Sequence, residues 1–238
     1  MKRKTIISPI VLALIMSSLC GPGLVYSGGG KKEKKSEHGD LPSHAELTAA
    51  LKTVVDVGEN AGFGLNMWAT IVNRDGEVCT VTFSGDDRGD QWPGSRAISA
   101  QKANTANAFS LPGLALSTSN LYSAVQPGGS LFGLQESNPV DPAVAYKGPA
   151  KNFGQANDPM VGKRIGGVNV FGGGLALYNS DGELVGAIGV SGDTSCTDHI
   201  IAWKVRDALD LDYVPAGVAP GAVDDDDQTT DNAVYDIS

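Results

Sequence analysis

The hydrophobic pattern of the chain contains two apolar hairpin signals, and the later one is the stronger. Apolar residues 175–177 and 184–190 lie on either side of Asn179-Ser180-Asp181-Gly182, whose Asp-Gly end favours the left-handed conformations of a tight turn. This pattern predicts a buried hairpin. The second arm is almost entirely small and apolar, so we expect both of its faces to be covered. Its glycines indicate that another backbone or a flat ligand comes close.

An earlier stretch repeats this arrangement. Apolar runs at residues 67–72 and 78–83 flank the turn Asn73-Arg74-Asp75-Gly76, which predicts a first hairpin. In both hairpins the last strand is followed by Ser-Gly-Asp, at residues 84–86 and 191–193. The similarity fits either two related strand-turn-strand units or a coincidence of common turn chemistry.

Helical spacing of apolar residues predicts three longer helices, over residues 44–60, 95–109 and 197–210. Ser43 and Glu46 form a capping box at the start of the first. Residues 113–167 are interrupted by many prolines and glycines, so we expect loops there, with short helical turns at 119–125. Residues 166–171 fit either a further strand or a bend.

Together these elements predict an α+β domain with an antiparallel sheet of about five strands and helices packed mainly on one face. The chain divides into a signal peptide at residues 1–27, a flexible tether at 28–43, the folded domain at 44–213 and an acidic, disordered tail at 214–238. The domain contains a Pro-rich insertion at about 136–165.

The N-terminal pattern predicts export to the periplasm or the extracellular space. Lys2-Arg3-Lys4 precedes an apolar run at residues 6–19 and small residues up to Ser27, as in a secretory signal peptide. The run is shorter than the roughly 20 residues needed to cross a bilayer, so we expect no membrane span in the mature chain. A lipoprotein modified at Cys20 is less favoured, because the residues before this cysteine match the usual pattern poorly.

Charge argues against nucleic acid as a partner. The chain has a formal net charge of −9, and removal of Lys2, Arg3 and Lys4 leaves 15 basic against 27 acidic side chains, or −12. Such a surface repels phosphates. Cys79 and Cys196 remain in the mature chain, and a disulfide, two free thiols or one thiolate ligand all fit the sequence.

Three motifs stand out in this part of the chain. They are Gly173-Gly174-Leu175 with residues 185–192, the helix signature Ser99-x-x-Lys102-Ala103-x-Thr105-Ala106, and residues 123–135. Together they resemble the GlcG/HbpS-like haem-binding family, and the third is similar to the C-terminal domain of PduO proteins. The resemblance covers roughly residues 44–211. It implies antiparallel strands flanked by helices, symmetric homo-oligomers that are often octamers, and haem as the cofactor. The insertion departs from the family pattern, which puts any inherited oligomer contact or pocket wall in doubt.

Haem requires an axial donor and an apolar slot. The first candidate for the iron ligand is His199, in the first turn of the last predicted helix, and the alternatives are His44 and Cys196. His38 lies in the predicted tether and is not a candidate. Around His199 we expect four further cofactor-binding residues, which are Gly189, Ser191, Gly192 and Asp198.

Lys102 is either an exposed helix lysine or a partner for a haem propionate. A serine hydrolase is disfavoured because the Gly-x-Ser-x-Gly elbow is missing around Ser191, and we assign no catalytic residue. The leading hypothesis is an exported protein that binds, stores or senses haem, with the haem edge between subunits. The alternatives are a haem-degrading or small-acid-modifying enzyme of the same fold, and an oligomeric interaction module without a ligand.

Overall fold

A computed structural model describes residue 39 and residues 41–214 of the chain. The predicted signal peptide, most of the predicted tether and nearly all of the predicted acidic tail lie outside the described residues. Within the described part, no helix has both the length and the hydropathy that a membrane span requires.

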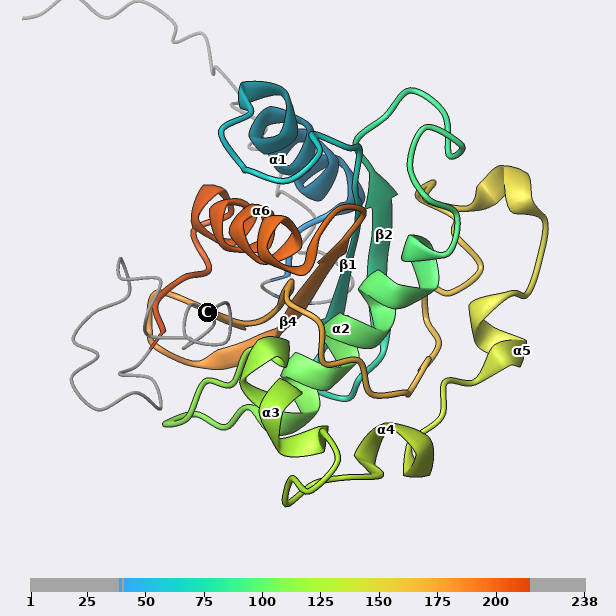
Figure 1. Cartoon of the computed structure of the whole chain (residues 1–238). Coiled ribbons are helices and arrows are strands. Elements are labelled where there is room, and N and C mark those ends of the chain that lie inside the picture. The colour runs from blue at the N-terminus through green and yellow to red at the C-terminus, as the bar shows by residue number, and fades with distance from the viewer. Residues whose placement is uncertain (1–38, 40, 215–238) are drawn as a thin grey trace, which may run out of the picture. The chain divides into compact units, whose positions relative to one another are not determined.

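The centre of the domain is a four-stranded antiparallel sheet built from two hairpins (Figure 1). The first hairpin consists of β1 (Trp68–Asn73) and β2 (Val78–Phe83), and the second of β3 (Gly174–Tyr178) and β4 (Leu184–Ser191). The strand order is β2-β1-β4-β3, so the two hairpins join through β1 and β4. Both predicted hairpins are confirmed.

The sheet has four strands, where the sequence predicted about five. The difference lies in the stretch at residues 166–171, which begins with Gly166 and Gly167 at φ values of 64° and 81°. These left-handed conformations are incompatible with an extended strand. The ladder contact of this stretch is a single bridge between Gly166 and Val140.

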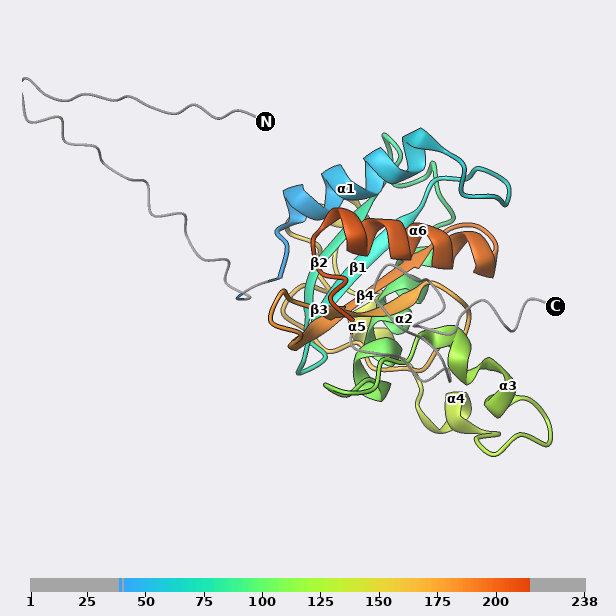
Figure 2. The same ribbon diagram turned by 90° about the vertical axis from the view of Figure 1, so that its left-hand side faces the viewer.

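Long helices cover both faces of the sheet, as Figures 1 and 2 show. On one face, α1 (His44–Val57) and α6 (Ser195–Ala208) pack their apolar sides on Ile71, Leu177 and Ile188. On the other, α2 (Ser95–Phe109) presents alanines to β1 and β4. The α+β class is therefore confirmed, with helices on both faces where the sequence predicted them mainly on one.

The segment between α2 and β3 contains only short helical elements. They are η1 (Thr118–Leu121), α3 (Tyr122–Val125), α4 (Leu134–Ser137), α5 (Pro142–Ala145) and η2 (Ala150–Asn152). The predicted helical turns at residues 119–125 are confirmed by η1 and α3. Most of the remaining elements belong to the Pro-rich insertion.

The insertion is part of the domain core. Met160 and Ile165 are fully buried in the same cluster as the alanines of α2. The insertion also reaches the outer edge of β2, where the Val78 N–H donates to the Lys163 carbonyl at 2.8 Å and the Gly162 N–H donates to the Val78 carbonyl at 2.9 Å. At the opposite edge of the sheet, the Tyr178 N–H donates to the Leu211 carbonyl at 2.9 Å.

Candidate functional site

The residues predicted around the end of β4 form a closed and buried cluster. Lys102, on α2, is 1% exposed, and its Nζ donates to Asp198 Oδ2 at 2.6 Å and to the Val190 carbonyl at 3.1 Å. The prediction of an exposed helix lysine is therefore wrong. A salt bridge from this ammonium to a ligand would first require breaking the ion pair with Asp198.

Asp198 uses its other oxygen inside the protein as well. Its Oδ1 accepts the backbone N–H groups of Gly192 at 3.0 Å and Asp193 at 2.9 Å. Burial raises the pKa of the Asp198 carboxyl, against the opposing effect of Lys102 and the two N–H groups. Burial likewise lowers the pKa of the Lys102 ammonium, against the opposing charge of Asp198. The pair thus joins α2, α6 and the loop after β4.

The glycines of this region lie against protein backbone. A Cβ at Gly189 would come within 1.9 Å of the Ser99 carbonyl oxygen on α2, and one at Gly192 within 2.5 Å of the Asn66 carbonyl oxygen. Ser191 is buried beside them. Of the two interpretations of the glycines of β4, the structure supports the close approach of another backbone.

His199 and Cys196 both lie near the start of α6. His199 is only 5% exposed, and its Cβ would lie 3.2 Å from a Cβ placed at Gly172. Cys196 is partly exposed, and Cys79 is buried in the sheet; both are free thiols. Burial raises the pKa of the Cys79 thiol to about 12. Among the described residues, no group of three or more His, Cys, Asp or Glu side chains could hold a metal ion.

His44 occupies a different environment, at the first residue of α1. Its ring is partly exposed, and Nε2 lies 2.9 Å from the carbonyl oxygen of Gly154 in the insertion. A carbonyl oxygen only accepts, so Nε2 carries the hydrogen of this bond. In the neutral imidazole, Nδ1 then keeps its lone pair and is the ring nitrogen left to bind a metal, while the other ring N–H is held by a carbonyl. The partner lies 110 residues away in the chain.

A buried ion pair holds Gly154 in place. The Gly154 N–H donates to Asp158 Oδ2 at 2.7 Å, and Arg96 Nε donates to the same oxygen at 2.8 Å. A second guanidinium nitrogen of Arg96 donates to Asp158 Oδ1, and the guanidinium carbon lies 3.8 Å from the centre of the Phe153 ring. The chain of contacts from Arg96 through Asp158 and Gly154 ends at the imidazole of His44.

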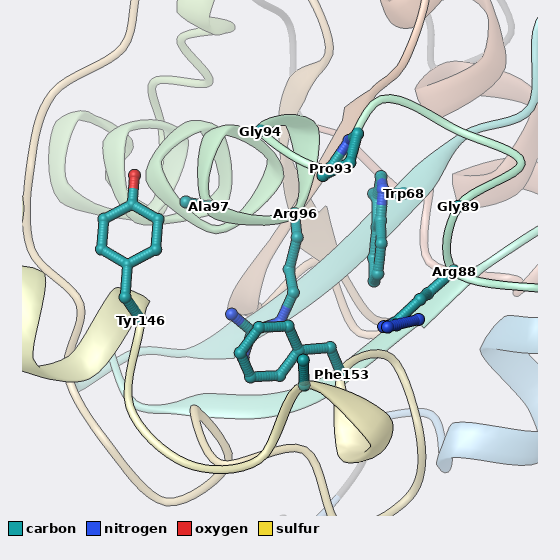
Figure 3. A pocket seen from close by; sticks show the side chains of 10 residues that line it. Trp68, Arg88, Gly89, Pro93, Gly94, Arg96, Ala97, Tyr146 and Phe153 are labelled. Atoms are coloured by element: carbon teal, nitrogen blue, oxygen red, sulfur yellow. The ribbon is translucent and has the colours of Figure 1, made fainter.

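Next to this network lies a cavity of about 440 Å³, shown in Figure 3. It lies between the N-terminal turn of α2, the loop before that helix and the insertion. Two of its ten lining residues are arginines and none is acidic. The full set is Trp68, Arg88, Gly89, Pro93, Gly94, Arg96, Ala97, Tyr146, Ala150 and Phe153. A neighbouring hollow of about 200 Å³ shares Arg88 and Phe153 and includes Lys151.

Sequence reasoning missed this cavity and the network beside it. Its walls come from β1, the loop before α2, α2 and the insertion, and no local motif joins them. The one usable signal was the long loop-like segment itself, since such segments often form binding surfaces.

Comparison with known protein families identifies one that matches this chain. Residues 43–207 match the family described as haem degrading protein HbpS-like. Among curated proteins, no match is found.

Several solved structures are similar to this chain, with low sequence identity. The protein ORFY from Klebsiella pneumoniae is 24% identical, with 71% of this chain and 90% of that chain covered and a TM-score of 0.47. PduOC, in its complex with haem, is 25% identical, with 71% and 94% covered and a TM-score of 0.48. A double mutant of HbpS from Streptomyces reticuli is 18% identical, with 79% and 98% covered and a TM-score of 0.45. Because the family match spans more than half of the sequence, this chain belongs to the HbpS-like family of haem degrading proteins.

Proposed function

We propose that this protein binds haem and that His44 is the axial ligand of the iron. The observation that carries the proposal is the family match over residues 43–207. Haem would supply an iron that takes an imidazole nitrogen as axial ligand, within a flat apolar ring that bears two propionates. The chain supplies such a donor in His44, whose partly exposed imidazole is held in one orientation by its hydrogen bond to the Gly154 carbonyl.

The hydrogen bond between His44 and Gly154 supports this choice of ligand. Metal-binding histidines usually donate the second ring N–H to a carbonyl or carboxylate, which fixes the tautomer and the ring orientation. His44 has this bond, and Arg96 and Asp158 hold the Gly154 peptide that accepts it. The hollow beside Phe153 is bordered by two exposed cations, Arg88 and Lys151, which would suit the propionates, and by two exposed carboxylates, Asp86 and Asp87.

His199 is the less favoured ligand, although the sequence ranked it first. Its side chain is buried, and the glycines near it already contact protein backbone. For an iron porphyrin to reach this imidazole, α6 would have to separate from the segment around Gly172. The side chain of His44 is partly exposed at the start of α1.

The test is a titration of the protein with hemin, followed by the Soret band. We compare the wild type with His44→Gln, whose amide can still donate to Gly154 but is a poor iron ligand. Ala45→Gln is the matched control, because it places the same amide on the next, exposed position of α1 and leaves the imidazole intact. The wild type and the control should bind equally, and His44→Gln should bind at least about tenfold more weakly. No Soret shift at stoichiometric hemin contradicts haem binding, and equal binding by His44→Gln contradicts the ligand.

Haem degradation is a second candidate, because the matching family is described as haem degrading. The hemin complex is treated with reductant or peroxide while the Soret band and iron release are followed. Repeated bleaching with more than one equivalent of iron released favours an enzyme. A stable band favours a protein that stores or senses haem.

Export and assembly complete the proposal. We propose that the protein is exported, on the basis of the basic start and apolar run within residues 1–27. N-terminal sequencing of the secreted form would identify the cleavage site, and retention of an intact N-terminus inside the cell would contradict export. The homo-oligomer implied by the family resemblance also stays a prediction, and analytical ultracentrifugation would give the subunit number.

A further inference from the structure

The cavity between α2 and the insertion has apolar, mostly flat walls. The rings of Trp68, Phe153 and Tyr146 line it together with Pro93 and Ala97 (Figure 3). Its volume of about 440 Å³ lies within the range of small-molecule sites. Rings of this kind favour a ligand with a flat apolar body, since aromatic faces and edges stack on one another.

The charge of the lining is unexpected for this chain. The whole sequence carries a formal net charge of −9, yet the cavity has two arginines and no acidic residue. Arg96 is already paired with the buried Asp158 and stacked on Phe153, so it serves as part of the wall. Arg88 is different, because its side chain is 44% exposed and pairs with Asp87 on an exposed loop at a distance of 3.8 Å. Such a loose pair leaves the guanidinium available to an anion.

Two further donors border the cavity. The helix α2 has 15 residues and begins beside Gly94 with no side-chain cap and no acidic residue in its first turn. Its N-terminus therefore keeps the partial positive charge of the helix dipole. Within the described part of the chain, the Nε1–H of Trp68 has no hydrogen-bond partner, although this residue is only 1% exposed. Figure 3 shows this nitrogen at the end of the indole nearest to Pro93. A buried donor without an acceptor is costly, which points to an acceptor supplied by a ligand.

We propose that this cavity binds an aromatic carboxylate of one or two rings. The apolar body lies among Phe153, Tyr146 and Trp68, and the carboxylate faces Arg88 and the start of α2. The site shares Arg88 and Phe153 with the neighbouring hollow, but His44 does not line the cavity. Binding of an aromatic carboxylate in His44→Gln therefore distinguishes this site from the proposed iron ligand.

The first test is calorimetric titration of the protein with 2-naphthoate and with its neutral analogue, 2-naphthamide. The two probes share an aromatic body and differ in charge. We expect the carboxylate to bind at least about tenfold more tightly than the amide, as for a charge-assisted hydrogen bond. Equal affinity for the two probes, or binding of neither, overturns the proposal.

A substitution at Gly94 tests the position of the carboxylate. No atom lies within 4 Å of a Cβ built at Gly94, and its φ of −63° suits any residue, so a side chain is accommodated there. Gly94→Asp places a negative charge at the start of α2, and Gly94→Asn places a neutral side chain of the same shape. We expect Gly94→Asp to weaken 2-naphthoate binding at least about tenfold and Gly94→Asn to change it less than about threefold. Equal binding by both variants overturns the assignment, and thermal melting confirms that both are folded.

Arg88 provides a second, independent check. Arg88→Gln removes the exposed guanidinium, and Lys147→Gln removes the same charge from an exposed residue that does not line the cavity. We expect a loss of about three- to tenfold in 2-naphthoate affinity for Arg88→Gln and no change for Lys147→Gln. If the two variants lose affinity equally, binding responds to net charge alone and the site is wrong.

Discussion

Removal of the Asp158 carboxylate should strongly destabilise the domain. This side chain is fully buried and accepts four N–H groups, two from Arg96 and one each from Gly154 and Met160. In Asp158→Ala, the guanidinium of Arg96 stays buried with the Ala145 carbonyl as its remaining hydrogen-bond acceptor. Leaving one charge of a buried pair without its partner costs about 3–5 kcal/mol of unfolding free energy.

That loss is large enough for a simple assay. For a domain of this size, 1 kcal/mol corresponds to about 2–4 °C in melting temperature, so Asp158→Ala should melt about 6–20 °C below the wild type. Urea unfolding followed by circular dichroism gives the free-energy difference, and hydrogen exchange shows whether the amides of the insertion lose protection first. The matched control is Glu77→Gln, which breaks the solvent-accessible pair between the exposed insertion residue Arg164 and the partly exposed Glu77 at 3.9 Å. Exposed pairs contribute about 0–1 kcal/mol. If Asp158→Ala costs no more than Glu77→Gln, the insertion is held by something other than this ion pair.

Three further predictions concern the buried cluster and the thiols. Gly189→Ala should lower the unfolding free energy by at least about 1–3 kcal/mol, because its methyl group meets the backbone of α2. Gly94→Ala is the control, since no atom lies within 4 Å of its methyl group. Equal melting temperatures for the two variants contradict this packing. Burial lowers the pKa of the Lys102 ammonium in the folded state, so between that lowered pKa and 10.5 the unfolded chain binds more protons than the folded one. The unfolding free energy of the wild type, compared with that of Lys102→Met, should therefore rise with pH in this range. Urea melts at about pH 8 and pH 10 give the sign, and a fall contradicts it. A thiol reagent at about pH 8 should modify Cys196 while sparing Cys79, whose pKa is raised to about 12, and peptide mapping that finds Cys79 modified first contradicts its burial.

Local patterns predicted most of the secondary structure. The predicted range of α2 agrees with its bounds of Ser95–Phe109, and the Ser43 capping box starts α1 as expected. The two Asn-x-Asp-Gly turns close the two hairpins, where the Asn73 and Asn179 side chains accept backbone N–H groups within each turn. These features depend on residues within four positions of one another, so the sequence alone reveals them.

The candidate site could not be predicted in the same way. Lys102 lies on an alanine-rich helix and looks like a solvent-exposed residue until Asp198, 96 positions later, is placed beside it. Similarly, nothing local distinguishes Asp158 from the other polar residues of the insertion. Its pairing with Arg96 spans 62 residues and depends on how the insertion folds back on α2. Long-range pairing of this kind is determined by tertiary packing, which propensity and periodicity do not encode.

The contacts at the two outer strands bear on how this protein avoids aggregation. An uncovered sheet edge offers free N–H and C=O groups that can template strands from other chains. Here Gly162 and Lys163 occupy both backbone groups of Val78 on β2, and Leu211 occupies the N–H of Tyr178 on β3. At each outer edge of the sheet, a segment of the same chain therefore covers one end of the edge strand. Truncation of either segment should expose a nucleus for fibril growth even where the rest of the fold survives.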